Sequence, residues 1–456
     1  MSAVLESEYL PVQIKIYDVP TETDITKLLP TGTPQEFPDV LTFQYYETLY
    51  DSFTTAYATV ADSAGVMEQL FEGKGFRPLC PVEVVITDPL YGKGAQRSVA
   101  EYDFSGEKCF FLKRIVNQVV KGKLKTYTLE LTTRDSLAAI ATTIKRSWPA
   151  DASTGIDYNT VVLNIMMDYI KTSKPTSLIS EEISEQVSKV MGNNYEPYKL
   201  INDACKKATP KTASSAAQEE DRPSGYVFWE TYNYGYNFKS IYNLITQTQE
   251  VGAEKTYKVA PVNEGSGLLN MAYNVISYAH SDSSKESDII EQIITGARSS
   301  RQKYIHDPAL NKVTLVTTAT SSKIKDDSTA APADTSFKPT THLQESQFQL
   351  EYINSCEKSE LNKKPLNPEH SSFNYGATLD TLRRNTSTIK IPGNLVLSAG
   401  DHVYVDFPLI AAQGTQTLPS SDKYSGYYLI TKLMHYVEDI TTIYTELEIV
   451  KLITTS

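Results

Sequence analysis

The residue types that most often catalyse reactions or bind metals are few in this chain and widely spaced. No two of its six histidines are closer than 26 residues: His280, His306, His342, His370, His402 and His435. The sequence therefore contains neither the H-E-x-x-H pattern of a zinc helix nor a local pair of His and Cys ligands. It also lacks the G-x-S-x-G turn of serine hydrolases and the G-x-x-x-x-G-K-S/T phosphate loop. We expect no metal site, no cofactor and no catalytic residue.

Three segments have some features of catalytic or nucleotide-binding motifs. Residues 91–95 (Tyr-Gly-Lys-Gly-Ala) follow a predicted strand, but the third glycine is missing and Arg97 stands where the helix would begin. Residues 264–267 (Glu-Gly-Ser-Gly) fail for the same reason. The acidic run 219–221 lies in a polar segment, where a fixed acid–base separation of about 5 to 10 Å would be hard to maintain. We interpret these segments as exposed turns and solvating charge.

The cysteines and the N-terminus indicate the compartment. The four cysteines are at least 29 residues apart, which excludes a C-x-x-C motif: Cys80, Cys109, Cys205 and Cys356. Four is also few for a disulfide scaffold, so we expect free thiols in a protein made in a reducing cytoplasm. Residues 1–8 lack the basic and apolar regions of a signal peptide, and no run of about 18 apolar residues occurs. We expect neither export nor a membrane span.

The composition indicates a folded, β-rich protein. Its 456 residues are 40% hydrophobic and 21% charged, which allows about two to four domains with apolar cores. Lys and Arg number 43 against 55 Asp and Glu, so the net charge is −12. An acidic surface repels polyanions, which disfavours tight binding to DNA or to an anionic membrane. The 30 tyrosines outnumber Phe and Trp, at 14 and 2, and this bias favours strands and contact surfaces.

The region before residue 134 shows the two-residue period of β-strands. Val12, Ile14 and Ile16 alternate with longer polar-tipped side chains, as in a half-buried strand. Residues 62–70 break the pattern with a capping residue ahead of an apolar stripe, which predicts a small helix plugging the strand array. Together these signals predict a meander or barrel. Further strands are predicted at 41–50, 53–60, 82–87, 110–120 and 124–131, with Lys121-Gly122 as a hairpin turn.

From about Arg134 the apolar period changes to three or four residues, which predicts amphipathic helices. The third helix, at 196–205, carries Pro197 near its start, where the missing N–H costs nothing. We interpret all three stripes as core. They consist of Leu137, Ile140, Ala141 and Ile144, then Val161, Ile165, Met166, Tyr169 and Ile170, then Leu200, Ile201, Ala204 and Ala208.

The remainder of the chain alternates polar segments with strands. Residues 209–224 and 321–341 lack large apolar groups, so burial cannot offset their chain entropy and we expect surface loops. The other predicted elements are aromatic strands at 226–232 and 234–238, helices at 240–246 and 286–298, and strands from 388 to the end.

Two segments near the middle of the chain resemble the baseplate hub proteins of contractile-tailed phages. Residues 195–198 (Tyr-Glu-Pro-Tyr) open a helix with Pro197 and Tyr198, as in that family. The pair 225–231 and 234–241 is similar to the family's Y-x-F-F-E-T … G-F-x-F-x-S-L strands, and its matching residues include Phe228, Trp229 and Glu230.

The C-terminal region carries the third resemblance. Residues 400–405, 425–435 and 444–450 look like the closing barrel of the same hubs and of the related spike proteins of type VI secretion. Their landmarks are Gly400-Asp401, Ser425-Gly426 and His435. Residues 62–67 match the family's D-S-x-G helix, and the four landmarks follow the family's order from Asp62 to Val450. The polar stretch 321–341 and the extended middle region depart from the pattern.

The resemblance implies an α+β, β-rich fold with two tail-tube-like antiparallel β-barrel domains and a helical or mixed insertion. The implied divisions are residues 1–133 for the first barrel, 134–224 for the helical insertion, 225–262 for strands of the second barrel, 263–387 for a mixed insertion and 388–456 for the closing strands. Unlike the type VI spikes, the sequence ends just after the second barrel, from which we expect the puncturing spike to be a separate chain.

The resemblance also implies a non-enzymatic role in a virion tail baseplate, assembled in the host cytoplasm. A homotrimer with two barrels per chain presents six similar modules, which can join a sixfold tail tube to a threefold spike. The implied partners are a second and third copy, the central spike protein, the tail-tube or tube-initiator protein, and tape-measure and wedge proteins. DNA would only pass through, because an acidic lumen repels phosphates.

Individual landmarks have alternative interpretations. A glycan-binding or cell-wall-degrading virion protein could use Phe228 and Trp229 for stacking, although adjacent aromatics in a strand more often divide between core and interface. His435 could be a ligand or proton carrier, although a strand-end histidine is more often a structural hydrogen-bonding group. Gly400 would supply a turn, and Asp401 would hydrogen-bond the backbone that follows. We favour the structural interpretation throughout.

Overall fold

The protein is described here by a computed structural model. For residues 34–36, 186, 246, 280, 301–307, 312–318 and 347–352 it describes the backbone only. Including these, it describes residues 12–17, 34–36, 40–62, 79–88, 90–91, 98–122, 124–149, 155–181, 183–184, 186–187, 189–208, 210, 225–246, 251–259, 272–280, 301–307, 312–318, 347–352, 375, 379, 382–383, 386–407, 424–438 and 442–452.

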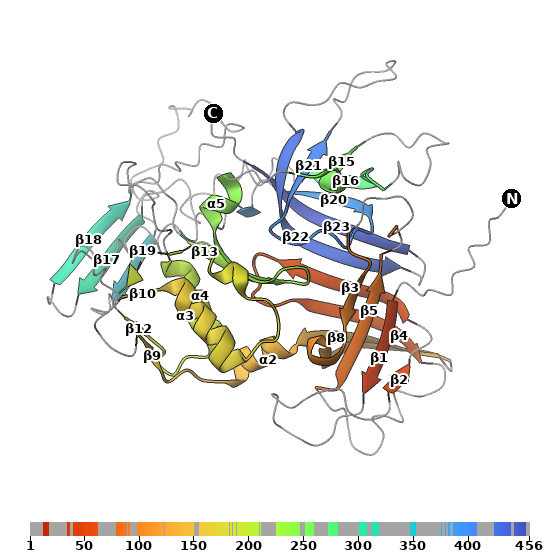
Figure 1. Cartoon of the computed structure of the whole chain (residues 1–456), viewed down its shortest axis with the longest axis horizontal. Coiled ribbons are helices and arrows are strands. Elements are labelled where there is room, and N and C mark those ends of the chain that lie inside the picture. The colour runs from red at the N-terminus through yellow and green to blue at the C-terminus, as the bar shows by residue number, and fades with distance from the viewer. Residues whose placement is uncertain are drawn as a thin grey trace.

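Fourteen of the described strands join one large sheet (Figure 1). Neighbouring strands pair antiparallel except for β15 and β21, which are parallel. β6 (Glu101–Phe104) pairs with β5, β21 (His402–Asp406) pairs with β22, and β15 (Thr256–Lys258) pairs with β21. The main order is β16 (Ser277–His280), β20 (Thr386–Pro392), β23 (Thr442–Lys451), β22 (Gly426–Glu438), β3 (Val40–Thr48), β4 (Thr55–Asp62), β8 (Leu124–Thr133), β7 (Phe110–Lys121), β5 (Pro81–Thr87), β1 (Val12–Tyr17) and β2 (Pro34–Glu36).

Strand β22 belongs to both halves of this sheet. Residues 426–429 pair with β21, whereas residues 432–438 pair with β3. β23 follows β22 along both parts, with a shift in register between Ile430 and Lys432. Because one strand donates and accepts backbone hydrogen bonds in both halves, the two halves cannot separate without breaking a sheet ladder.

The C-terminal half closes into a small barrel. β16 pairs with β20, and an isolated bridge between Lys258 and Asn274 joins β15 to the segment just before β16. The Val275 N–H donates to the Lys258 carbonyl at 2.9 Å, which completes the circuit. The side chains in its interior are apolar: Tyr257, Val275, Ile389, Ile391, Leu397, Val403, Val405, Phe407, Tyr428, Ile430, Leu433, Leu447 and Ile449.

The N-terminal half bends around a core of its own. In this core the ring of Tyr45 in β3 lies against Tyr102 and Phe104 of β6, with ring centroids 5.9 and 5.1 Å apart. Val12, Ile14 and Ile16 enter this core as their alternation predicts. Three C-terminal residues also contribute: Leu395, Val437 and Ile443. The two halves therefore share apolar packing as well as a strand.

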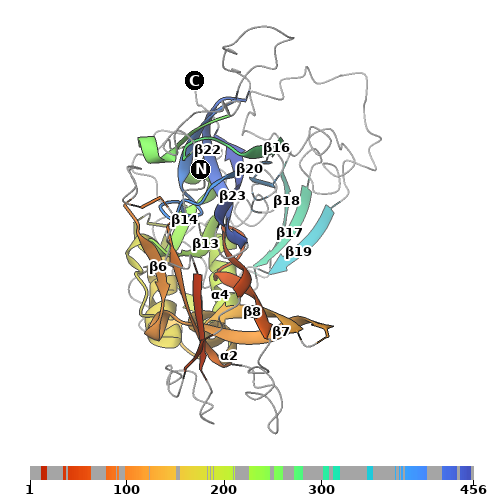
Figure 2. The ribbon, with the colours of Figure 1, turned by 90° about the vertical axis from the view of Figure 1, so that its right-hand side faces the viewer.

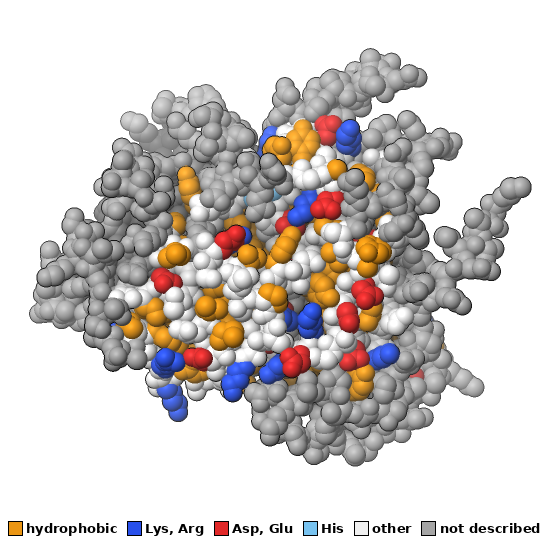
Figure 3. All heavy atoms as spheres, in the orientation of Figure 1, with side chains coloured by type: hydrophobic (Ala, Val, Ile, Leu, Met, Phe, Trp, Pro, Cys, Tyr) orange, Lys and Arg blue, Asp and Glu red, His pale blue; other side chains and the backbone are white. Residues whose placement is uncertain are grey.

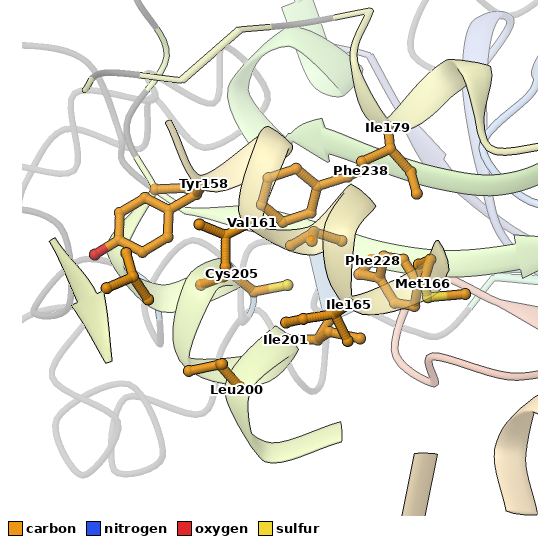
Figure 4. Close-up of a cluster of buried hydrophobic side chains, with 14 of the residues drawn as sticks. Tyr158, Val161, Ile165, Met166, Ile179, Leu200, Ile201, Cys205, Phe228 and Phe238 are labelled. Atoms are coloured by element: carbon orange, nitrogen blue, oxygen red, sulfur yellow. The ribbon is translucent and has the colours of Figure 1, made fainter. Parts of the chain in front are cut away.

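A helical layer lies beside the sheet and packs on a separate aromatic hairpin (Figure 4). Asp157 caps α3 by accepting from the Thr160 N–H at 2.7 Å, and Pro197 begins α4. The helices are α2 (Arg134–Ala141), α3 (Tyr158–Asn164) with the π-helix η3 (Ile165–Ile170), α4 (Pro197–Lys207) and α5 (Ile241–Thr246), with 3-10 turns η2 (Gly106–Lys108), η4 (Ser177–Ile179) and η6 (Ala253–Lys255).

Several short strand pairs complete the fold. β9 (Ser147–Trp148) pairs with β12 (Val190–Met191), β10 (Ile156–Asp157) with β11 (Gln186–Val187), and β13 (Tyr226–Thr231) with β14 (Gly235–Ser240). A further sheet contains β17 (Arg301–Asp307), β18 (Lys312–Thr318) and β19 (Gln347–Tyr352). None of the helices in the described part of the chain is long and apolar enough to cross a membrane.

The β-rich, α+β class is confirmed, and most predicted elements lie where the sequence placed them. The hairpin turn at Lys121-Gly122 is present, with Gly122 at a φ of 64°. Ile140 and Ala141 are corrections, because Ile140 is 62% exposed, Ala141 is exposed as well, and the buried apolar residues of α2 are Ala138 and Ala139. Of the helix predicted at 62–70, only Asp62 is described, and it ends β4. Other predictions lie outside the described residues: the helix at 286–298, nearly all of 209–224, the glycine run 264–267 and the segment 321–341.

The assignment of residues 225–262 to the second barrel also needs correction. Within this range only β15 joins the large sheet, whereas β13 and β14 pair with each other. All six residues of β13 are buried, so the hairpin is covered on both faces. One face contacts the helices through Phe228, and the other contacts the C-terminal half through Trp229. A strand buried on both sides fits between two layers better than in a barrel wall.

Truncating a core residue of the shared strand should weaken both halves. Leu433→Ala removes a side chain that is 1% exposed, and we expect the free energy of unfolding to fall by about 2–5 kcal/mol in urea titrations. Met434→Ala, on the opposite and half-exposed face, should cost about 1 kcal/mol or less. Hydrogen exchange in Leu433→Ala should accelerate in β3 as well as in β21. Acceleration confined to β21 and β22 would contradict the coupling.

Candidate functional site at the junction of the two halves

The turn between β13 and β14 lies between the two halves of the large sheet. The Tyr232 ring stacks on Tyr102 of the N-terminal half, with centroids 4.0 Å apart and planes inclined by 24°. The Asp103 N–H donates to the Tyr232 hydroxyl at 2.8 Å. Asn233 Nδ2 donates to the Leu395 carbonyl of the C-terminal half at 3.1 Å. The turn therefore holds one half with its aromatic ring and the other with its amide.

The predicted landmarks Trp229 and Gly400 meet at this junction. Trp229 Nε1 donates to the Ala399 carbonyl at 2.9 Å, so the buried indole has its hydrogen-bond partner. Gly400 has a φ of 91°, and a Cβ atom there would lie 2.6 Å from Trp229 Cζ2. Both the backbone conformation and the close ring require glycine. Two segments of the sequence resemblance, 171 residues apart in the chain, are thus one packing unit.

Asp401 fixes the loop that carries Gly400. Its Oδ2 accepts from the Ser398 N–H at 2.9 Å and lies 3.0 Å from Lys255 Nζ. Burial raises the pKa of Asp401, while the neighbouring Lys255 opposes that shift. Burial by itself would lower the pKa of Lys255, but the Asp401 charge, the Tyr234 hydroxyl and the hydrogen bonds to both together outweigh it, and the pKa is raised. The sequence predicted that Asp401 hydrogen-bonds the backbone that follows it, whereas the backbone N–H that its side chain accepts from belongs to Ser398, which precedes it.

A carboxyl group that sequence reasoning missed lies at the centre of the junction. Glu47 is fully buried and accepts from the Tyr45 hydroxyl at 3.0 Å, the Tyr232 N–H at 2.8 Å and the Ala399 N–H at 3.0 Å. It therefore joins β3, the hairpin turn and the 398–401 loop. Burial raises the pKa of Glu47 to about 8, although these hydrogen bonds oppose the shift. The available signal was its place in the inward alternation Phe43, Tyr45, Glu47.

The predicted landmark Glu230 forms a second buried polar group. It is ion-paired with Lys174, and its Oε2 accepts from the Thr54 N–H at 3.0 Å. Burial raises the pKa of Glu230, and Lys174 opposes that shift. Nearby, the Tyr236 hydroxyl donates to Asp135 Oδ2 at 2.7 Å. These contacts connect the helical layer, the hairpin and the start of β4.

His435 is a structural residue of the N-terminal core. It is fully buried, its Nδ1 lies 2.9 Å from the Thr445 hydroxyl, and its ring stacks on Tyr45 with planes inclined by 8°. Tyr102 contacts the same ring edge-on, with centroids 5.4 Å apart. Tyr45 also bonds to Glu47, so the histidine supports the junction from one side.

The remaining predicted landmarks lie elsewhere. Pro197 starts α4, and Tyr198 beside it is 40% exposed. Phe228 stacks on Tyr236 inside the helical layer, with centroids 5.5 Å apart. Ser425 accepts from the Phe407 N–H at 2.9 Å, and Gly426 follows with a φ of 146° at the start of β22. The structure therefore gathers Trp229, Glu230, Gly400, Asp401 and His435 around the junction and leaves the other five landmarks at separate places.

The junction is built to hold segments together. Its carboxylates accept from backbone N–H groups or pair with lysines, and its aromatic rings are buried in packing contacts. Across the described residues, no three His, Cys, Asp or Glu side chains are grouped as a metal ion would need. On the face shown in Figure 3, hydrophobic side chains are interspersed with polar and charged ones. These contacts hold the hairpin turn, the 398–401 loop and strand β3 together.

The outer face of the large sheet is the second feature of functional interest. It runs without a break from β20 through β23, β22, β3 and β4 to β8, and its side chains are mostly half-exposed. One row across the strands contains Lys390, Glu446, Met434, Tyr46 and Thr55. Tyr, Thr and charged side chains make up most of it. Its charged residues are Lys390, Lys432, Glu130, Glu438, Glu446 and Glu448.

Removing the cation beside Glu230 should be strongly destabilising. Lys174→Met leaves a buried carboxylate without its ion-pair partner, and we expect a loss of about 3–5 kcal/mol in the free energy of unfolding. Lys145→Met, on an exposed side chain, is the matched control and should change it by about 0.5 kcal/mol or less. Equal stability of the two variants in urea titrations would show that the buried pair does not support the fold.

Glu47 should make stability depend on pH. Its folded pKa of about 8 lies above the unfolded value of 4.5, so the folded state binds the extra proton between these values. The stabilisation is complete below the unfolded pKa and is lost as pH rises through the folded pKa, by up to about 1.4 kcal/mol per pH unit. Glu47→Gln should flatten the fall in stability between pH 5 and 8, measured by urea titration at each pH. An unchanged slope would contradict the assignment.

Comparisons with known proteins give remote structural similarities. No family model matches the sequence, and no curated protein sequence matches it. The structure is similar to the tail protein from Neisseria meningitidis MC58, with 7% identity, a TM-score of 0.47 and 96% of each chain covered. It is also similar to the 43 kDa tail protein of prophage MuSo2 from Shewanella oneidensis, with 8% identity, a TM-score of 0.47, and 96% of this chain and 97% of that chain covered. A third similar structure is an Escherichia coli component of the type VI secretion system, with 8% identity and a TM-score of 0.40. The match covers 96% of this chain and 76% of that chain. Similarity at this level does not by itself assign a function.

Proposed function

We propose that this chain is a structural baseplate hub of a contractile phage tail, a homotrimeric adaptor that joins the sixfold tail tube to the threefold central spike around a DNA channel. The observation that carries the proposal is the single continuous sheet that passes through two barrel-like halves along β22. One chain thus supplies two modules in a fixed relation. Three such chains supply six, which is what an adaptor between sixfold and threefold structures requires.

The sequence resemblance gains support from where its residues lie. The aromatic hairpin motif and the Gly400-Asp401 motif contact each other directly through Trp229. This contact determines how the two halves fit together. The two motifs are therefore expected in any protein that has the same arrangement of halves. The motifs therefore indicate shared architecture, and the proposed role is non-enzymatic.

The outer face of the large sheet is suited to line a channel. It is continuous across both halves, and the carboxylates on it that reach solvent, Glu438, Glu446 and Glu448, stand against two lysines. A wall that is hydrated and slightly acidic repels phosphate, so DNA would slide past without binding. In this arrangement the apolar cores stay shielded from the channel. The surfaces that face away from the channel are free to contact the spike, the tube and the wedge proteins of the virion baseplate.

The runner-up function, a virion protein that binds or degrades glycans, is disfavoured by burial. Its stacking platform would be Phe228 and Trp229, but these side chains are 3% and 2% exposed. Stacking on a sugar needs an accessible ring face. A turbidity assay with cell walls or polysaccharide gives the independent test: clearing above the buffer control would support this alternative against the hub.

The mass of the purified chain in solution tests the proposal. Sedimentation equilibrium should give a species near three times 50.8 kDa, either alone or after addition of the spike protein. Three copies are required because two copies supply four modules and cannot match sixfold symmetry. A chain that stays monomeric under both conditions would contradict the hub.

A further inference from the structure

The hairpin of β7 and β8 extends beyond its core. β7 is buried only at its first three residues, and from Lys113 to its end at Lys121 it is exposed on both faces apart from the half-buried Ile115. In its partner β8, both faces of the strand are buried only from Leu129 onward. Figure 2 shows these two strands running out from the body of the molecule. We call residues 113–127 the ribbon.

The ribbon carries apolar side chains on both of its faces. Val119 and Leu124 lie on the face that continues the outer side of the sheet, and Val120 lies on the other. Val116 and Val120 are 51% and 56% exposed. A two-stranded ribbon is at best marginally stable alone in water, and exposed valines on both faces add to that cost. These are the features of a segment that is covered on assembly.

The ribbon is also cationic within an acidic protein. Residues 113–125 contain five Lys or Arg and no Asp or Glu. Subtracting these five from the total of 43 leaves 38 Lys and Arg against 55 Asp and Glu, a net charge of −17 for the remaining sequence. Glu130 at the base pairs with Lys113, with Nζ and Oε1 2.7 Å apart, and with Arg114. Beyond that base, Lys121 at the end of β7 is exposed, and Lys125 lies opposite Asp62 of β4.

We propose that the ribbon is a docking arm that binds a second copy of this chain, on an acidic surface of the neighbour. The occupant follows from charge complementarity, because the ribbon sequence holds five cations, two of them paired with Glu130 at its base, whereas the remaining sequence has a net charge of −17. An arm and a separate acceptor surface make a head-to-tail contact, which closes into a ring when the rotation permits. The inference rests on the proposed homotrimer and identifies the surface that would form it.

Nucleic acid is the other polyelectrolyte that a cationic ribbon could bind. The valines favour protein, since apolar side chains that stay exposed beside phosphates would remain in contact with water. The acidic remainder of the chain would also repel DNA held close to the body. DNA binding is therefore treated as an outcome of the test that would overturn the proposal.

The test compares two matched triple variants of the full chain. The ribbon variant is Val119→Ser, Val120→Ser and Lys121→Glu, and the control is Ile140→Ser, Met167→Ser and Lys145→Glu, which changes two exposed apolar residues and one exposed lysine of the helical region. Sedimentation velocity over a concentration series gives the association constant of each. Circular dichroism melting of both variants checks that the fold is kept.

We expect association of the ribbon variant to be at least tenfold weaker than that of the wild type and of the control. Raising the salt concentration should weaken wild-type association more than that of the ribbon variant, because screening removes the charge contribution. Wild-type association with an unchanged ribbon variant would overturn the arm while leaving the trimeric hub intact. A wild type that stays monomeric both alone and with the spike protein added would overturn both. Loss of binding to labelled duplex DNA with association unchanged would identify the ribbon as a nucleic-acid contact instead.

Discussion

The sharing of strand β22 between two barrel-like halves is the constraint on which the rest of the structure depends. Its first part completes the C-terminal barrel with β21, and its second part pairs with β3 of the N-terminal half. The cores on either side are therefore built around one backbone ladder. Val437 and Ile443 belong to C-terminal strands but pack in the N-terminal core. The N-terminal core is therefore complete only when the C-terminal strands are in place.

Buried polar contacts at the junction add to the stabilisation that the shared strand provides. Glu47 collects donors from β3, the β13–β14 turn and the 398–401 loop, and Glu230 is paired with Lys174 from the helical layer. Desolvating carboxylates costs free energy, as the raised pKa of Glu47 indicates. We interpret these groups as fixing which loop meets which strand, since a misplaced loop would leave a buried carboxylate without donors. That interpretation is tested by the pH slope of the Glu47 variant.

Sequence periodicity located most strands and helices because alternation and capping are local signals, as at Val12–Tyr17 and Pro197. The resemblance also located Trp229 and Gly400, although their contact could not be predicted from their separation. Glu47 and Lys174 were missed because their partners come from residues 232, 399 and 230, far away in sequence. The β13–β14 hairpin was placed in the wrong sheet, since an aromatic strand shows burial but not which layers bury it.

The most direct test of the central claim is a cryo-electron microscopy reconstruction of the assembled particle. The proposal predicts three copies around an open channel, six barrel modules in the ring, and the outer sheet face with Tyr46 and Glu446 lining the lumen. A reconstruction in which that sheet face points outward, or in which no continuous channel crosses the assembly, would contradict the proposed hub.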